Sequence, residues 1–162
     1  MPGREHRVLF LCTGNSARSI MAEALLNRLG QGRFRAFSAG SHPKGTVHPQ
    51  ALAQLRREGL PAEGYRSKSW DEFGGPQAAP MDVVITVCDR AAAESCPFWP
   101  GAPISAHWGV DDPAEVPEAE QPAAFARAYR ELEKRVRKLV ELPIDMLDAA
   151  TLRDRLREAG QA

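Results

Sequence analysis

The chain has 162 residues, 43% of them hydrophobic and 26% charged, which is ordinary for one soluble domain. Its 21 Lys and Arg balance 21 Asp and Glu, and this excludes the basic excess that nonspecific nucleic-acid binding needs. No run approaches the ~18 apolar residues of a membrane helix, and the first residues contain no apolar signal core. We therefore expect a cytoplasmic protein with neither a membrane nor a nucleic-acid partner.

The first half of the chain predicts two strands, each followed by a helix. The apolar run 7–12 is typical of a buried strand, and apolar residues at helical spacing over 19–29 predict a helix that ends at Gly30. A second strand is expected over 33–39. A second helix is expected over 48–59, because its proline stands in the first turn, where the missing N–H group is harmless.

The second half begins with a loop-like region, 61–80, which is rich in Gly, Pro, Ser and charge and predicts at most one helical turn over 69–73. The remaining elements that we expect are strands over 82–88 and 104–107, an amphipathic helix through 125–140 and one extra helix over 144–160.

Alternating strands and helices predict an α/β fold, in which each pair of parallel neighbours is joined by a crossover. We expect a single three-layer domain with a four-stranded parallel sheet flanked by helices. The catalytic domain is assigned to residues 1–142 and a C-terminal helical extension to 143–162. Ligands of such folds bind at the carboxyl ends of the strands, which directs attention to the segment after the first strand.

That segment, residues 12–19, is the strongest candidate for a functional site, and we call it the oxyanion loop. Five residues separate Cys12 from Arg18, and the segment opens directly into a helix. Backbone N–H groups of small residues and the positive end of a helix dipole attract an oxyanion, and an arginine can grip two of its oxygens. The residues predicted to contact the oxyanion are Thr13, Gly14, Asn15, Ser16, Ala17, Arg18 and Ser19.

Cys12 is predicted to be a nucleophile at the centre of this loop. An ordinary thiol has a pKa of ~8.5, whereas cysteines at helix N-termini beside cations have values of ~3.5–7.5. A downward shift of about three units takes roughly 4 kcal/mol, which the helix, Arg18 and the Ser19 hydroxyl can share. The alternative is a buried cysteine followed by a polar turn. The strand before the loop and the helix after it favour the nucleophile.

The oxyanion loop, together with a later Asp-Pro pair, resembles the low-molecular-weight protein tyrosine phosphatase superfamily. Within that superfamily, residues 12–16, 38–40 and 107–114 are similar to the arsenate reductase branch. The resemblance implies arsenate as substrate, phosphate or sulfate as competing oxyanions, and Asp112 as the general acid. A carboxyl group held before Pro113 would reach the mouth of the loop, although Asp-Pro is also common in ordinary turns.

Reducing arsenate to arsenite takes two electrons, which thiols can supply. Cys12 would attack arsenic, and Cys88, at the end of the third strand, would then attack Cys12 and form a disulfide. Resemblance to the thioredoxin-linked reductases implies that Cys96 takes over this disulfide. Seven residues separate Cys88 from Cys96, one more than in those reductases. The alternative is that Cys88 is buried core and Cys96 an incidental loop thiol.

The same reasoning predicts no tightly bound cofactor but requires an external thiol donor, which would be thioredoxin, glutaredoxin with glutathione, or a mycothiol-type thiol. A first alternative function is a low-molecular-weight phosphatase that acts through a phosphocysteine. The resembling phosphatases carry a tyrosine after Asp-Pro where this chain has Ala114, which weakens that alternative. A second alternative is a non-catalytic module that binds an oxyanion or a phosphoprotein.

No metal ion is predicted. Some of the resembling reductases bind potassium near the loop, and Asn15, Glu23 and Ser38 match that site, but Trp70 stands where its acidic ligand is expected. The four histidines are scattered along the chain without metal-ligand spacing.

Overall fold

The structure is a computed structural model that describes residues 5–74, 78–87 and 103–161. Cys88 and Cys96 therefore lie outside the described residues, and so does the end of the strand that was expected over 82–88.

The sheet has four parallel strands, as predicted. They are β1 (His6–Leu11), β2 (Phe34–Ala39), β3 (Val83–Thr86) and β4 (Ile104–His107), in the order β2-β1-β3-β4. Leu11 pairs in register with Ala39 and Thr86, and Thr86 pairs with His107. The four strands therefore end at one edge of the sheet, where their following loops meet.

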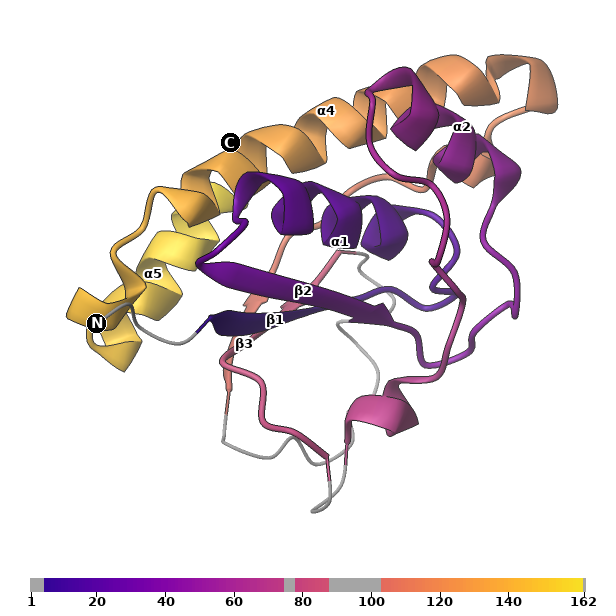
Figure 1. The fold of residues 1–162 in the computed structure, drawn as a ribbon. Helices are drawn as coiled ribbons and strands as arrows, with labels where there is room; N and C mark the ends of the chain where they lie inside the picture. Colours follow the sequence, from indigo (N-terminus) through magenta and orange to yellow (C-terminus); the bar gives the residue numbers. More distant parts are fainter. Residues whose placement is uncertain (1–4, 75–77, 88–102, 162) are drawn as a thin grey trace.

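Helices cover one face of this sheet (Figure 1). They are α1 (Arg18–Leu29), α2 (Pro49–Arg57), α4 (Gln121–Val140) and α5 (Ala149–Ala159). The long helix α4 packs on α1 and α2 and buries one apolar face, including Phe125, Leu132 and Val136. Because β1 is buried on both faces, its run of apolar residues reads as continuous rather than alternating.

The opposite face of the sheet has a smaller core formed by Leu9, Leu11 and Val84. The 3₁₀ helix η1 (Trp70–Phe73), which Figure 1 shows below the sheet, packs its aromatic residues against this core. The sheet thus has apolar layers on both faces, which agrees with the predicted three-layer architecture.

The extra C-terminal helix differs from the prediction. The segment 144–160 divides into a 3₁₀ turn, η4 (Ile144–Met146), and the helix α5, which begins after Asp148. The Asp148 side chain accepts a hydrogen bond from the Thr151 N–H group at 2.7 Å, so it caps a helix that starts later than expected. Leucines four residues apart fit either start, and the cap decides between them. The division between residues 1–142 and 143–162 stays a prediction.

α5 is part of the main core. Leu152 and Leu156 are buried, and the Leu156 carbonyl accepts a 2.8 Å hydrogen bond from the indole N–H of Trp108, which is fully buried. Within the described part of the chain, no helix combines the length and the hydropathy needed to span a membrane.

Candidate active site

The oxyanion loop connects the end of β1 to the start of α1. Cys12 follows directly after β1, and its N–H group donates to the Ala39 carbonyl at 3.2 Å, so the sheet fixes where the thiol stands. The thiol is buried, with the residue 4% exposed. Ala17 occupies the N-cap of α1 and provides no side-chain acceptor, which leaves the first N–H groups of the helix uncapped by that residue. Uncapped N–H groups at the positive end of a helix attract an anion.

Asn15 shapes this loop. Its φ of 44° lies in the left-handed region, which asparagine tolerates better than most residues. The side chain is fully buried and makes two hydrogen bonds. Its Nδ2 donates to Ser19 Oγ at 2.8 Å, and its Oδ1 accepts from the Lys68 N–H group at 2.9 Å. Asn15 therefore joins the loop to the first turn of α1 and to a segment far along the chain.

Gly40, just after β2, provides the space in which the loop lies. A Cβ at this position would stand 2.5 Å from the Thr13 carbonyl oxygen and 2.7 Å from that of Cys12. Any other residue would have to push backbone away, so glycine is required by close packing rather than by its φ angle.

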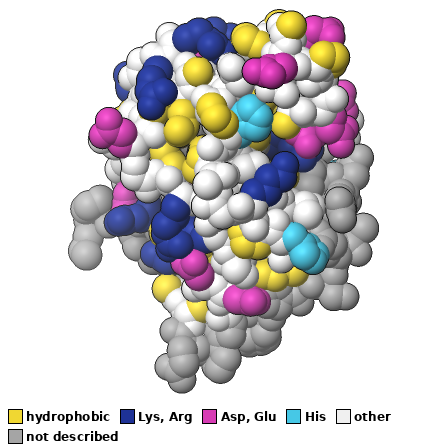
Figure 2. All heavy atoms as spheres, turned by 90° about the vertical axis from the view of Figure 1, so that its right-hand side faces the viewer, with side chains coloured by type: hydrophobic (Ala, Val, Ile, Leu, Met, Phe, Trp, Pro, Cys, Tyr) yellow, Lys and Arg dark blue, Asp and Glu magenta, His cyan; other side chains and the backbone are white. Residues whose placement is uncertain are grey.

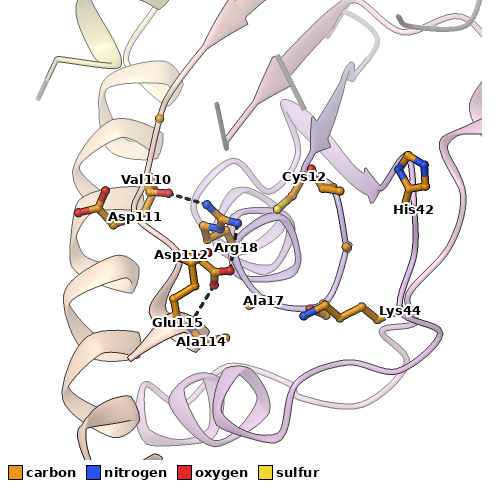
Figure 3. A pocket seen from close by; sticks show the side chains of 14 residues that line it. Cys12, Ala17, Arg18, His42, Lys44, Val110, Asp111, Asp112, Ala114 and Glu115 are labelled. Carbon is orange, nitrogen blue, oxygen red and sulfur yellow. Dashed lines mark hydrogen bonds and ion pairs between the residues drawn. The ribbon is translucent and has the colours of Figure 1, made fainter. Parts of the chain in front are cut away.

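Arg18 leans across the mouth of the loop toward the segment that follows β4 (Figure 3). Its Nη1 donates to the Val110 carbonyl at 2.7 Å, and its Nη2 lies 3.6 Å from Asp112 Oδ2. The Nε atom is buried and has no hydrogen-bond partner among the described residues. Because buried N–H groups are nearly always paired in folded proteins, this donor points to an acceptor that arrives as a ligand.

Asp112 lies opposite the thiol, on a segment that we call the Asp112 loop (residues 108–112). Its Oδ1 accepts from the Ala114 N–H group at 3.0 Å and so caps the short 3₁₀ helix η2 (Pro113–Glu115), which orients the carboxylate. Asp111 is exposed, and Figure 3 shows its carboxylate turned away from Arg18. Of the two neighbouring aspartates, only Asp112 therefore has its carboxylate beside Arg18.

Three contacts anchor the Asp112 loop to the rest of the fold. The Val110 N–H group donates to the Val87 carbonyl at 3.1 Å, Arg135 of α4 donates to the Gly109 carbonyl at 2.9 Å, and Trp108 is held by α5 as described above. The position of the predicted general acid therefore depends on the sheet and on both C-terminal helices.

These groups line one open pocket of about 810 Å³. Arg18 and Asp112 stand on one side of it, His42 and Lys44 stand on the other, and the side chain of Cys12 points toward Arg18 (Figure 3). The described wall contains no aromatic ring of Phe, Tyr or Trp. Figure 2 looks onto this side of the molecule, where basic, acidic and histidine side chains are interspersed. A polar wall of this kind suits a small oxyanion better than an aryl group.

His48 caps α2 close to this pocket. Its Nδ1 accepts from the Gln50 N–H group at 3.0 Å, and its ring packs on Phe125 with the centroids 4.8 Å apart. Burial lowers the pKa of His48, the charge of Lys44 lowers it further, and Asp112 partly offsets both effects. The cap needs a neutral ring, and the lowered pKa favours that form.

This environment predicts that His48 weakens the fold in mild acid. Its folded-state pKa lies below the ordinary value of 6.5, so the unfolded chain takes up the proton first as the pH falls. The contribution of neutral His48 to stability is fully present above pH 6.5 and is lost as the pH falls through the folded-state pKa of His48. Replacing His48 with Asn keeps a capping acceptor that does not titrate. We expect urea unfolding at about pH 7.5 and about pH 5.5 to show a smaller loss in His48→Asn than in the wild type. An equal loss in both proteins would contradict this assignment.

The potassium site implied by resemblance does not fit this structure. The Lys68 ammonium lies 3.5 Å from Ser38 Oγ, and Ser38 in turn donates to Glu23 Oε1 at 2.6 Å. A positive charge that belongs to the chain itself already stands beside the oxygens that would ligate the ion. Among residues 5–74, 78–87 and 103–161, no three His, Cys, Asp or Glu side chains are grouped to hold a metal.

The structure brings together Cys12, Arg18, Ser19 and Asp112 with the loop residues between them, while Cys88 and Cys96 lie outside the described residues. Sequence reasoning missed the functional positions of Gly40, Lys44 and Lys68. Gly40 follows a strand, and in the sequence it indicates only that the strand ends there. The lysines stand in polar loops, where only the fold shows that Lys44 lines the pocket and that Lys68 lies behind the oxyanion loop.

The site and fold together define an α/β protein with a parallel sheet whose first strand runs through a cysteine-arginine loop into a helix, with a pocket at that edge. This chain belongs to the low molecular weight phosphotyrosine protein phosphatase family, whose family model matches residues 7–153.

Several proteins that are similar to this chain are arsenate reductases. The arsenate reductase of Halalkalibacterium halodurans is 35% identical over 136 residues, which cover 83% of this chain and 94% of that protein. The crystal structure of arsenate reductase from Archaeoglobus fulgidus superimposes with a TM-score of 0.66 at 32% identity, covering 83% of this chain and 99% of the other. A structure described as an arsenate reductase in the phosphate binding state gives a TM-score of 0.70 at 29% identity, over 84% and 97% of the two chains.

Proposed function

We propose that this protein is a thiol-dependent arsenate reductase. One observation carries the proposal: a buried cysteine and Arg18, whose Nε has no hydrogen-bond partner among the described residues, line an open polar pocket at the start of a helix that its N-cap residue leaves uncapped. The relatives named above support arsenate, and the phosphate-bound relative supports phosphate as a competing oxyanion. The expected external partners are arsenate and a thiol donor such as thioredoxin or glutaredoxin with glutathione.

The first step joins arsenate to Cys12. The thiolate attacks arsenic and an As–S bond forms, while one arsenate hydroxyl group takes up a proton, its As–O bond breaks and it leaves as water. We assign the delivery of that proton to Asp112 as a carboxylic acid, and the position of its carboxyl group 3.6 Å from Arg18 Nη2 supports the assignment. Arg18 and the N–H groups of the oxyanion loop hold the remaining oxygens and stabilise their negative charge.

The second step transfers two electrons to arsenic. A thiolate of Cys88 attacks the sulfur of Cys12, the As–S bond breaks, and its electron pair stays on arsenic, which leaves as arsenite. Cys12 and Cys88 are then joined in a disulfide, so the two thiols have supplied both electrons. Cys96 exchanges with this disulfide and presents a Cys88–Cys96 bond to the external thiol donor.

The course of β3 supports Cys88 as the attacking thiol. Val87, the residue before it, donates its N–H group to the Leu11 carbonyl at 2.8 Å, directly before Cys12 in the chain. Val87, the last described residue before Cys88, therefore lies beside the end of β1.

The test is turnover of arsenate by the purified protein with a thioredoxin or glutaredoxin system, followed by consumption of NADPH. We expect arsenate-dependent consumption with one of the donors. If no thiol donor supports turnover, the protein is not an arsenate reductase.

A phosphatase that works through a phosphocysteine is the second candidate, because the family model bears that name and the same loop would hold a phosphate ester. Its expected substrate is a small aryl phosphate. The pocket wall favours it less, since the described lining residues offer no aromatic ring to stack on a phenyl group.

Cys88→Ser separates the two candidates. We expect arsenite formation to fall below about 1% of wild type, because no second thiol can resolve the Cys12 adduct, while any phosphatase activity persists. Arsenite is measured directly by mass spectrometry. The matched variant Cys96→Ser should still release one arsenite per protein in a single turnover and fail only in repeated turnover. Unchanged arsenite formation by Cys88→Ser would remove Cys88 from the relay.

A further inference from the structure

Lys68 belongs to a strand-like segment that passes behind the oxyanion loop. The Gly40 N–H group donates to the Lys68 carbonyl at 2.9 Å, and the Trp70 N–H group donates to the Gly40 carbonyl at 2.9 Å, so backbone pairing ties this segment to the end of β2. On its other side, the Lys68 N–H group donates to Asn15 Oδ1 at 2.9 Å, and Ser67 Oγ donates to the Gly14 carbonyl at 3.0 Å. The segment therefore holds the oxyanion loop directly.

The side chain of Lys68 is buried at the same place, with the residue 9% exposed. Its Nζ donates to the Arg66 carbonyl at 2.9 Å and lies 3.5 Å from Ser38 Oγ. The Ser38 hydroxyl donates to Glu23 Oε1, so its oxygen is left to accept from the ammonium. Lys68, Ser38 and Glu23 thus form a chain of donors and acceptors that ends on α1.

Glu23 connects this cluster to the loop from the helix side. It stands four residues after Ser19 on α1, on the same face of the helix, and Ser19 Oγ accepts from Asn15 Nδ2. Asn15 is therefore held from both ends of the cluster, through the Lys68 backbone and through the first turn of α1.

The charges in the cluster depend on one another. Burial raises the pKa of Glu23, whereas Ser38 and the charge of Lys68 lower it. Burial likewise lowers the pKa of Lys68, and Glu23 raises it. Arg66, the other cation nearby, is exposed and bonds Glu72 at 2.9 Å through Nη1. Neither Glu23 nor Lys68 lines the pocket, so this pair acts from behind the loop.

We propose that Lys68 is a positioning residue: its backbone N–H group holds Asn15, and its ammonium, a cation built into the chain, fixes that backbone behind the oxyanion loop through the Arg66 carbonyl and Ser38, without a bound potassium ion. The proposal rests on the oxyanion site of the proposed function and not on arsenate being its substrate. In wild-type protein, potassium then has no separate place to bind. Removing the ammonium while leaving space should create one.

The experiment compares Lys68→Met, which keeps most of the stem without charge, with Lys68→Ala, which leaves a space. Lys138→Met, on the exposed surface of α4, is the matched control. Phosphate binding is measured by calorimetry, and the pH dependence of Cys12 alkylation is followed by mass spectrometry of the Cys12 peptide. Each measurement is made in sodium, potassium and ethylammonium chloride. None of these measurements requires arsenate reduction. Wild-type protein that binds phosphate but does not reduce arsenate would therefore contradict only the proposed function.

We expect both Lys68 variants to bind phosphate about 10- to 100-fold more weakly in sodium, the usual range for residues that orient a site from behind, with Cys12 alkylation shifted to higher pH. Potassium or ethylammonium should restore Lys68→Ala but not Lys68→Met. Wild type and Lys138→Met should not respond to the choice of cation. A folded Lys68→Met with wild-type phosphate binding and alkylation would overturn the proposal, and so would a Lys68→Ala that no cation restores.

A double variant guards against simple misfolding. Glu23→Gln with Lys68→Met removes both charges, and replacing a buried ion pair by neutral groups often preserves the fold. We expect this variant to fold and still bind phosphate weakly, because no cation holds the loop. If the double variant binds phosphate as tightly as wild type, then Lys68 only neutralises Glu23, and the proposal is wrong.

Discussion

Replacing Cys12 with serine is expected to abolish arsenate reduction and phosphate-ester hydrolysis together, by about 10⁴-fold or more. The loop geometry changes little, since the N–H groups of the loop and Arg18 remain in place. The loss comes from chemistry, because a serine hydroxyl at this position is neither ionised near neutral pH nor able to enter a disulfide.

Steady-state kinetics and phosphate calorimetry on Cys12→Ser check this prediction. Phosphate should still bind, which shows that the oxyanion loop is folded in the variant. Residual reduction above about 1% of wild type would mean that another thiol attacks arsenic first, and the assignment of Cys12 would be wrong.

The second large effect is expected from Arg18→Lys. The guanidinium bonds the Val110 carbonyl, approaches Asp112 and keeps a buried Nε for the ligand, three tasks that a single ammonium cannot perform together. We expect kcat/KM for arsenate to fall by about 10²- to 10³-fold, the cost of removing one oriented oxyanion donor.

Phosphate binding should weaken in Arg18→Lys as well, because the ground-state oxyanion uses the same donors. Arg137→Lys on the exposed face of α4 is the matched control and should behave as wild type. Kinetics within about threefold of wild type for Arg18→Lys would show that a point charge suffices and that the several donors of the guanidinium are not needed.

Much of the active site was predictable because local signals agree there. An apolar strand, a loop of small residues and a helix of regular apolar spacing together place Cys12 and Arg18, and the structure has the loop where these signals put it. Asp112 was assigned through the resemblance, from its position directly before Pro113, and the structure has it as the N-cap of the short helix η2. This part of the fold could be predicted from the sequence because the neighbouring signals agree with one another.

The remaining features depend on contacts between distant segments. Lys68 lies in a polar stretch with no periodicity, and its importance arises from Asn15, 53 residues away. Gly40 matters only because the oxyanion loop passes within van der Waals distance of it. No local pattern encodes these contacts. The start of α5 was misplaced for a local reason instead: the cap between Asp148 and Thr151 competes with an apolar spacing that also fits an earlier start.

The central claim is that arsenate is reduced by electrons from Cys12 and Cys88. It is tested most directly by mixing fully reduced protein with arsenate, without any external thiol, and mapping disulfides by mass spectrometry after a single turnover. We predict one arsenite per protein and a Cys12–Cys88 bond, or a Cys88–Cys96 bond where the exchange has proceeded. Arsenate that leaves all three thiols reduced, with no arsenite formed, would contradict the account.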